Sequence, residues 1–172
     1  MRRFKAIGAM AAALAVAIAA SPAAAAIDWD RAANIKDAAT RLVQMHRRQG
    51  SPGVLKFLDA CYRTHMLANE FGAGLEACLA QDYMHSNVLV QIYARVPPEQ
   101  RAKNKNPSAG DIAKSLGERF VVAFAQYKMT SDDVAAFKKL VDKYGLPIFL
   151  KGVFPNAAGP TITPEDPRDK KN

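Results

Sequence analysis

The sequence predicts an all-α protein, a small helical bundle of about five helices. Apolar residues recur every three or four positions along most of the chain, in runs separated by Pro, Gly and helix-capping residues. No run alternates apolar and polar residues over a length that would favour a strand. The only two cysteines lie in neighbouring helical runs on either side of a glycine-containing turn. They predict a disulfide-stapled antiparallel helical hairpin within the bundle.

Residues 1–26 have the features of a cleavable secretory signal peptide. Three basic residues precede an uncharged, alanine-rich stretch at 6–20, and small residues at 23–26 fit an Ala-x-Ala cleavage site. The apolar stretch is shorter than the roughly 20 residues that span a bilayer as a helix. We therefore expect cleavage rather than an uncleaved N-terminal anchor, no transmembrane segment in the mature chain, and a periplasmic or secreted location.

The part of the chain after the predicted signal forms one domain in this interpretation. Removing residues 1–26 leaves 146 residues and lowers the formal net charge from +8 to +5, because the signal holds three basic and no acidic residues. A chain of that length can enclose a single core. We expect a single helical domain at 27–154. Residues 155–172, rich in Pro, Gly and charge, are expected to be a disordered tail.

Two helices are predicted before the hairpin turn. Residues 30–48 carry an apolar stripe and end in the cations His46-Arg47-Arg48, which favour a helix C-terminus. Ser51-Pro52-Gly53 then resembles a helix start with proline at the first helical position. The stripes of the two helices are Ile35, Ala38, Ala39, Leu42 and Met45, followed by Val54, Leu58, Cys61 and His65.

The hairpin turn is predicted at residues 69–74, where two glycines interrupt the helical pattern. A new stripe begins at Leu75, and Cys61 and Cys78 lie nearly symmetrically about the turn. An even number of cysteines in an oxidising compartment favours a disulfide. Closing a loop of about 18 residues would stabilise the fold by roughly 3 kcal/mol in the chain-entropy model.

The second half of the chain continues with helices. Pro97-Pro98 ends the third helix, and a polar loop is predicted up to Pro107. Ser108 and Asp111 fit a capping box that opens a helix reaching Tyr127. A further helix capped by Thr130 or Ser131 ends at Gly145, and a short apolar segment extends to Phe154.

The residue types around the hairpin argue against a metal or haem cofactor. The run that starts at Cys61 lacks the Cys-x-x-Cys-His arrangement of covalent haem attachment. A zinc site made by Cys61, His65 and Cys78 would need reduced thiolates and a fourth ligand. Asp82 is expected too far along the hairpin axis to be that ligand. We therefore expect no cofactor, and we keep His65 as a candidate binding residue.

Asp82 is the most unusual residue of the apolar stripes. A carboxylate on an apolar face needs hydrogen-bond or charge partners. His85 is three residues along, and Lys56 or Arg63 is expected to reach Asp82 from the opposing helix. Ser86 and His85 point about 100° apart on one helix, so they do not form a nucleophile–base pair. Asp82 is either a structural tie between helices or a binding residue.

The segment from Arg95 to Lys105 is strongly basic and contains only one acid, Glu99. Its candidate binding residues are Arg101, Lys103 and Lys105. The segment is either a solvated loop or a docking surface for an anionic envelope component or protein partner. Nucleic acid is a poor fit, because the basic residues have no interleaved aromatics and match no recognised motif.

Together these residues predict a non-catalytic binding or interaction module of the cell envelope. No metal set, nucleophile–base pair or phosphate-binding loop emerges, so no catalytic residue is assigned. The alternative is a hydrolase-type enzyme that uses acid–base chemistry around Asp82, His65 and His85. A polar-lined groove that brought two of these side chains together would favour the enzyme.

Overall fold

The computed structural model describes residues 27–156, and within them it contains six helices and no strand. The predicted all-α class is therefore confirmed. The predicted signal peptide, and the predicted tail from residue 157 onward, lie outside the described residues. The helices are α1 (Arg31–His65), α2 (Ala73–Ala94), α3 (Pro98–Lys103), α4 (Ala109–Gln126), α5 (Ser131–Tyr144) and α6 (Leu146–Val153).

The first two predicted helices are joined as α1, which kinks at Gly50. This residue has φ +65° and ψ −170°, a left-handed conformation that glycine adopts without the steric cost of a Cβ atom. Ser51-Pro52 opens the second segment of α1, residues 51–65, as the sequence predicts. Asp30 caps the first segment by accepting a hydrogen bond from the backbone N–H of Ala33 at 3.0 Å.

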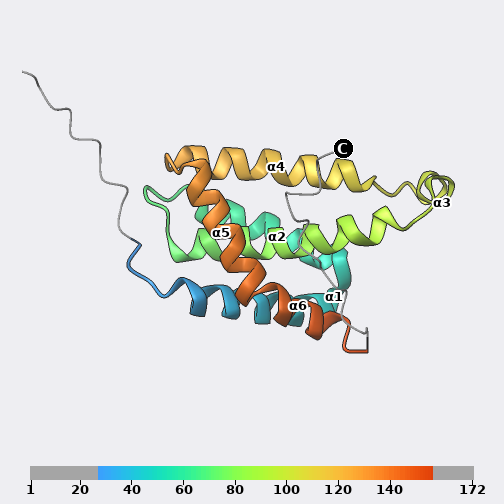
Figure 1. Ribbon diagram of the computed structural model, residues 1–172, viewed down its shortest axis with the longest axis horizontal. Helices are drawn as coiled ribbons and strands as arrows, with labels where there is room; N and C mark the ends of the chain where they lie inside the picture. The colour runs from blue at the N-terminus through green and yellow to red at the C-terminus, as the bar shows by residue number, and fades with distance from the viewer. Residues whose placement is uncertain (1–26, 157–172) are drawn as a thin grey trace, which may run out of the picture.

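α2 is the central helix of the bundle, and α1, α4 and α5 pack against it (Figure 1). α5 runs steeply across the bundle and leads into α6, which packs along α1. Because neighbours surround α2, its residues 75–86 are almost all buried rather than buried along one stripe. The buried residues include the polar side chains Glu76, Gln81, Asp82, His85 and Ser86.

Aromatic side chains of α4 and α5 fill the core beside α2. Phe120, Phe124 and Phe137 contact one another edge to face with ring centroids 5.5–5.9 Å apart. The predicted capping box of Ser108 and Asp111 is present at the start of α4. Of the two predicted caps of the next helix, Thr130 is the one that caps α5, and it forms a capping box with Asp133. These caps fix where the two helices begin, and so fix the register of the aromatic face against α2.

The disulfide-stapled hairpin is confirmed. Cys61 of α1 and Cys78 of α2 are bonded, with their Cα atoms 5.8 Å apart. His65, one turn beyond Cys61, packs its ring directly over Gly74, where any Cβ atom would clash with it. The staple therefore ties the second segment of α1 to the central helix close to the turn that joins them.

The segment predicted as a polar loop contains the short helix α3, so that prediction was wrong in part. Pro98 occupies the first position of α3, where its missing N–H costs nothing. Arg101 is half-buried, and its guanidinium donates to the backbone carbonyls of Tyr93 and Val96 at 2.9 and 3.1 Å. It caps the end of α2. Lys103 and Lys105 are exposed.

Within residues 27–156, no helix combines the length and the apolar character that crossing a membrane would require.

Candidate functional site

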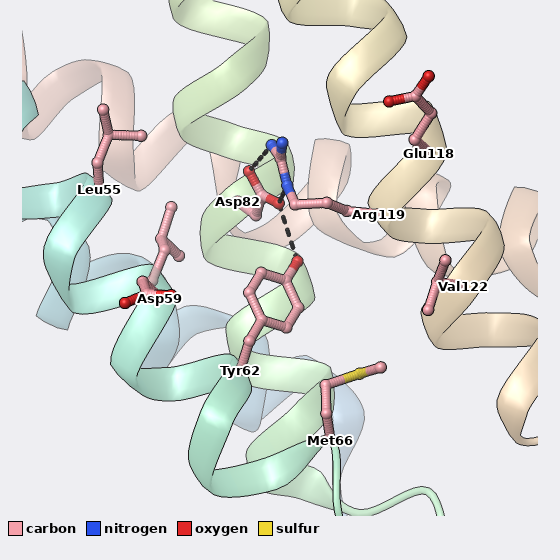
Figure 2. A pocket seen from close by; sticks show the side chains of 9 residues that line it. Leu55, Asp59, Tyr62, Met66, Asp82, Glu118, Arg119 and Val122 are labelled. Carbon is pink, nitrogen blue, oxygen red and sulfur yellow. Dashed lines mark hydrogen bonds and ion pairs between the residues drawn. The ribbon is translucent and has the colours of Figure 1, made fainter.

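An open cavity of about 530 Å³ lies between the second segment of α1, α2 and α4 (Figure 2). We call it the α1–α4 groove. Its walls are mainly apolar, with charged side chains at the floor and at the rim. It is lined by Leu55, Leu58, Asp59 and Tyr62 of α1, by Met66 at the C-cap of that helix, by Asp82 of α2, and by Glu118, Arg119 and Val122 of α4.

The groove exists because its two walls do not meet. α1 and α4 each pack extensively against α2, whereas they hardly contact each other. The central helix therefore forms a floor that is left open between them. On α1 the lining extends from Leu55 to Met66, which is about three helical turns. The groove is thus elongated along the helices.

Asp82 lies at the floor and accepts hydrogen bonds on both carboxylate oxygens (Figure 2). Arg119 donates to it from two nitrogens: Nε is 2.6 Å from Oδ2, and Nη2 is 2.7 Å from Oδ1. The Tyr62 hydroxyl donates to Oδ2 at 2.9 Å, and the Ser86 hydroxyl donates to Oδ1 at 3.0 Å. A carboxylate has about four lone-pair sites, so these four bonds use its whole accepting capacity.

The cation that pairs with Asp82 is Arg119 of α4, so the prediction of Lys56 or Arg63 was wrong. Arg63 forms an ion pair with Asp59 instead, on the same exposed face of α1. An i,i+4 pair such as this one is always within reach on a helix. Asp82, by contrast, is buried on the face of α2 that α4 covers, so its partner comes from α4.

The charge states around Asp82 are fixed at neutral pH. Burial, followed by the neighbouring Asp82 carboxylate, raises the pKa of Tyr62 well above its ordinary value, so the phenol stays a hydrogen-bond donor. The hydrogen bond to Asp82 raises the pKa of Arg119. These groups hold the helices together as a neutral, fully hydrogen-bonded unit. Neither Tyr62 nor Arg119 is therefore poised to transfer a proton near neutral pH.

The structure does not bring Asp82, His85 and His65 together. Among the described residues no hydrogen bond joins any two of them, and His85 Nε2 instead lies 3.3 Å from the Ser51 hydroxyl. Burial, and then the charge of His46, lower the pKa of His85 to about 4. His65 lies beside the disulfide, in a separate hollow from the groove. The acid–base constellation of the enzyme alternative is therefore not assembled.

Cys61, His65 and Cys78 place three donor atoms within 4.8 Å of one another. The two sulfur atoms are bonded to each other, so neither is a thiolate that could ligate zinc. In the oxidised state the cluster offers a metal only the His65 imidazole. The close approach of the three side chains is explained by the disulfide and by the packing of His65 over Gly74.

Arg119 and Tyr62 are the partners of Asp82 that the sequence analysis did not assign to it. Arg119 falls on the apolar stripe of α4, three residues after Leu116 and four before Ala123, both of which are buried. An arginine at that spacing needs a buried acceptor, as a lone carboxylate does on another helix. Each of two apolar stripes contains one charged residue, Asp82 on one helix and Arg119 on the other. Their opposite charges are the signal that could have identified the contact.

Glu76 is a second buried acid that the sequence analysis did not single out. It is fully buried at the start of α2 and accepts from Trp29 Nε1 at 2.6 Å and from Asn34 Nδ2 at 3.0 Å. Arg31 completes the set through an ion pair. These contacts tie the beginning of α1 to α2 and lie away from the groove, so we assign them to stability.

In comparisons with known proteins, no family model, no curated sequence and no solved structure matches this chain. The function of the groove therefore has to be inferred from its own residues.

Proposed function

We propose that this chain is an exported, non-catalytic binding protein of the cell envelope that holds its partner in the α1–α4 groove. The observation that carries the proposal is the combination of an open apolar groove with a floor whose polar groups are already satisfied. Asp82 has no free acceptor site, and Arg119 and Tyr62 are committed to it. Such a floor supports binding by shape and apolar contact rather than chemistry on a substrate.

The dimensions and the rim of the groove support a binding role. Ligand sites commonly enclose about 300–1,000 Å³ and are mostly apolar with a few placed polar groups. Leu55 and Val122, on opposite walls, are 54% and 60% exposed. Large apolar side chains left uncovered on both sides of a cavity are costly in water, and they favour contact with an apolar partner.

Export is supported by the signal-like features of residues 1–26 and by the disulfide. Disulfides persist in oxidising compartments and are rare where glutathione keeps thiols reduced. In this proposal the exposed Lys103 and Lys105 add a cationic surface near α3, distinct from the groove, that would contact an anionic envelope partner. Arg101 contributes less to such a surface, because it is committed to the end of α2.

The test is binding of an environment-sensitive apolar dye to the full-length protein after export and processing. Val122→Asp places a charge inside the groove, and Val121→Asp is its matched control. Val121 is the adjacent residue of α4, is 69% exposed and does not line the groove. Loss of one apolar contact and addition of a desolvated charge should weaken binding about tenfold for Val122→Asp and leave Val121→Asp near wild type.

Two results would count against this proposed function. One is an absence of saturable dye binding to the wild-type protein. The other is equal weakening by the two substitutions, which would place the dye elsewhere on the surface. Both variants carry the change on the exposed side of α4, so circular dichroism should give unchanged helicity and thermal transitions within a few degrees.

A further inference from the structure

We infer that the partner of the α1–α4 groove is a basic amphipathic helix, presented by another protein or peptide. This inference rests on the proposed function, and it adds the shape and the charge of the partner. Three features of the groove carry it: its length along α1, the flexible apolar side chains inside it, and the acidic residues on both of its walls.

The groove has a length and a shape that would accommodate one additional helix. Its α1 wall runs from Leu55 to Met66, which corresponds to about 16 Å at 1.5 Å per residue. Two helices form the walls and a third forms the floor, as in the grooves that accept amphipathic helices through anchors at i, i+3 or i+4, and i+7. A helix of about three turns would fill this length, and it would cover the exposed Leu55 and Val122 together.

The interior suits apolar anchors of varying size. The buried Leu58 and the half-buried Tyr62 form the deeper part of the α1 wall, and Met66 lies at one end. Methionine is unbranched and polarisable, so it adapts to different apolar side chains. These contacts would bind leucine-like anchors on one face of the incoming helix, while its polar face stays in water.

The charges of the lining favour a basic partner. Asp59 stands on the α1 wall and Glu118 on the α4 wall, with side chains 59% and 66% exposed (Figure 2). The cation of the lining, Arg119, is neutralised by Asp82. The groove therefore has a formal charge of −2, carried by its two opposite rims. On a partner helix, basic side chains on either side of the apolar stripe would each lie near one of these acids, Asp59 or Glu118.

The rim acids remain available to a partner. Asp59 and Glu118 have i,i+4 neighbours, Arg63 and Lys114, but these neighbours are about 77–78% exposed and the Lys114–Glu118 separation is 3.9 Å. Exposed pairs of this kind contribute little and exchange readily with other cations. An anionic amphiphile such as a fatty acid would find no unpaired cation among the lining residues, since Arg119 is paired with Asp82.

The experiment uses two dye-labelled helical peptides of about 14 residues with the same leucine stripe. One carries lysine at the remaining positions and the other carries glutamate, and binding to the processed protein is followed by fluorescence anisotropy. Two rim charges should make the lysine peptide bind about tenfold more tightly than the glutamate peptide at low salt, with the difference shrinking at high salt. The double variant Asp59→Lys/Glu118→Lys should reverse the preference.

Asp37→Lys is the matched control for the charge reversal. Asp37 forms an i,i+4 pair with Arg41 on the first segment of α1, its side chain is 61% exposed, and it does not line the groove. This change should leave the preference for the lysine peptide intact. Val122→Asp should weaken binding of both peptides, because it acts on the shared apolar stripe.

The outcomes separate this inference from the proposed function. If both peptides bind equally and both are weakened by Val122→Asp, the groove binds but its partner is not defined by basic charge, and the inference fails alone. Tighter binding of the glutamate peptide or of a fatty acid would also overturn it. So would a wild-type dimer that Val122→Asp dissociates, since the occupant would then be a second copy. No binding of dye or peptide would remove the proposed function as well.

Discussion

His85 should make the stability of this protein depend on pH between about 6.5 and 4. The side chain is only 2% exposed, and its pKa in the folded protein is lowered from 6.5 to about 4, mainly by burial. It faces Ser51 and the charges of His46, Asp82 and Arg119, of which only Asp82 opposes the lowering. The unfolded chain therefore binds a proton at a pH where the folded chain does not.

The difference between the folded and unfolded pKa of His85 determines the sign and the size of the change in unfolding free energy with pH. The stabilisation from neutral His85 is complete above pH 6.5, and it is lost as the pH falls towards 4 because only the unfolded state gains the proton. A pKa of 6.5 against one of about 4 corresponds to about 3 kcal/mol of unfolding free energy. The pKa of His46 is also lowered by burial, so it adds a contribution of the same sign.

Urea denaturation at pH 7, 5.5 and 4 measures this loss. The capping acids Asp111 and Asp133 have lowered pKa values, so their contributions are lost mainly at lower pH than those of the histidines. Burial raises the pKa of Asp142, so protonation of this carboxyl group opposes part of the loss as the pH falls. His85→Gln should flatten most of the pH dependence. If that variant folds poorly, NMR titration of the wild-type His85 ring replaces it. A ring pKa near 6.5, or unchanged stability between pH 7 and 4, would refute the reasoning.

Three further predictions concern the ion pair, the disulfide and the basic segment. Arg119→Met should lower the free energy of unfolding by about 2–3 kcal/mol in urea denaturation, which is small for a broken buried ion pair because Arg119 is partly exposed. Adding Asp82→Asn should recover part of this loss, and a double variant whose two effects simply add would contradict the coupling. Cys78→Ser should cost about 2–5 kcal/mol, and thiol labelling of denatured, non-reduced wild type should find no free thiol; an unchanged thermal transition would show that the staple contributes little. Lys103→Glu combined with Lys105→Glu should reduce low-salt co-sedimentation with envelope fractions and leave high-salt binding unchanged; association insensitive to both salt and substitution would leave the segment a solvated connector.

Much of the helical architecture was predictable because its signals are local. Capping residues such as Ser108 and Thr130 mark helix starts through contacts only three residues away. Ser51-Pro52-Gly53 marks the start of a new helical segment, and the cysteines on either side of the turn mark a hairpin, both by residue type and spacing. The helix α3 was not predicted, because its six residues include none that is buried and so carry no apolar period.

The site was harder to predict because it depends on which helices are neighbours. Asp82 could be identified as an acid in need of a partner, but its partner Arg119 is 37 residues away on a helix whose position the sequence does not specify. The predicted hairpin instead favoured Lys56 or Arg63 of the opposing helix, and in the structure Arg63 pairs with Asp59 of its own helix. The groove itself is a consequence of α1 and α4 both packing on α2 without meeting, a property of topology rather than of any one segment.

The position of the bound partner is the most direct test of the central claim that the α1–α4 groove is a binding site. Methyl groups report it well, since the groove presents Leu55, Leu58, Met66 and Val122. Titrating methyl-labelled protein with the leucine–lysine peptide should shift these four signals first and saturably in ¹H–¹³C spectra, with Leu79 of the core unaffected. Saturable shifts confined to methyl groups outside the groove, with these four unchanged, would contradict the claim.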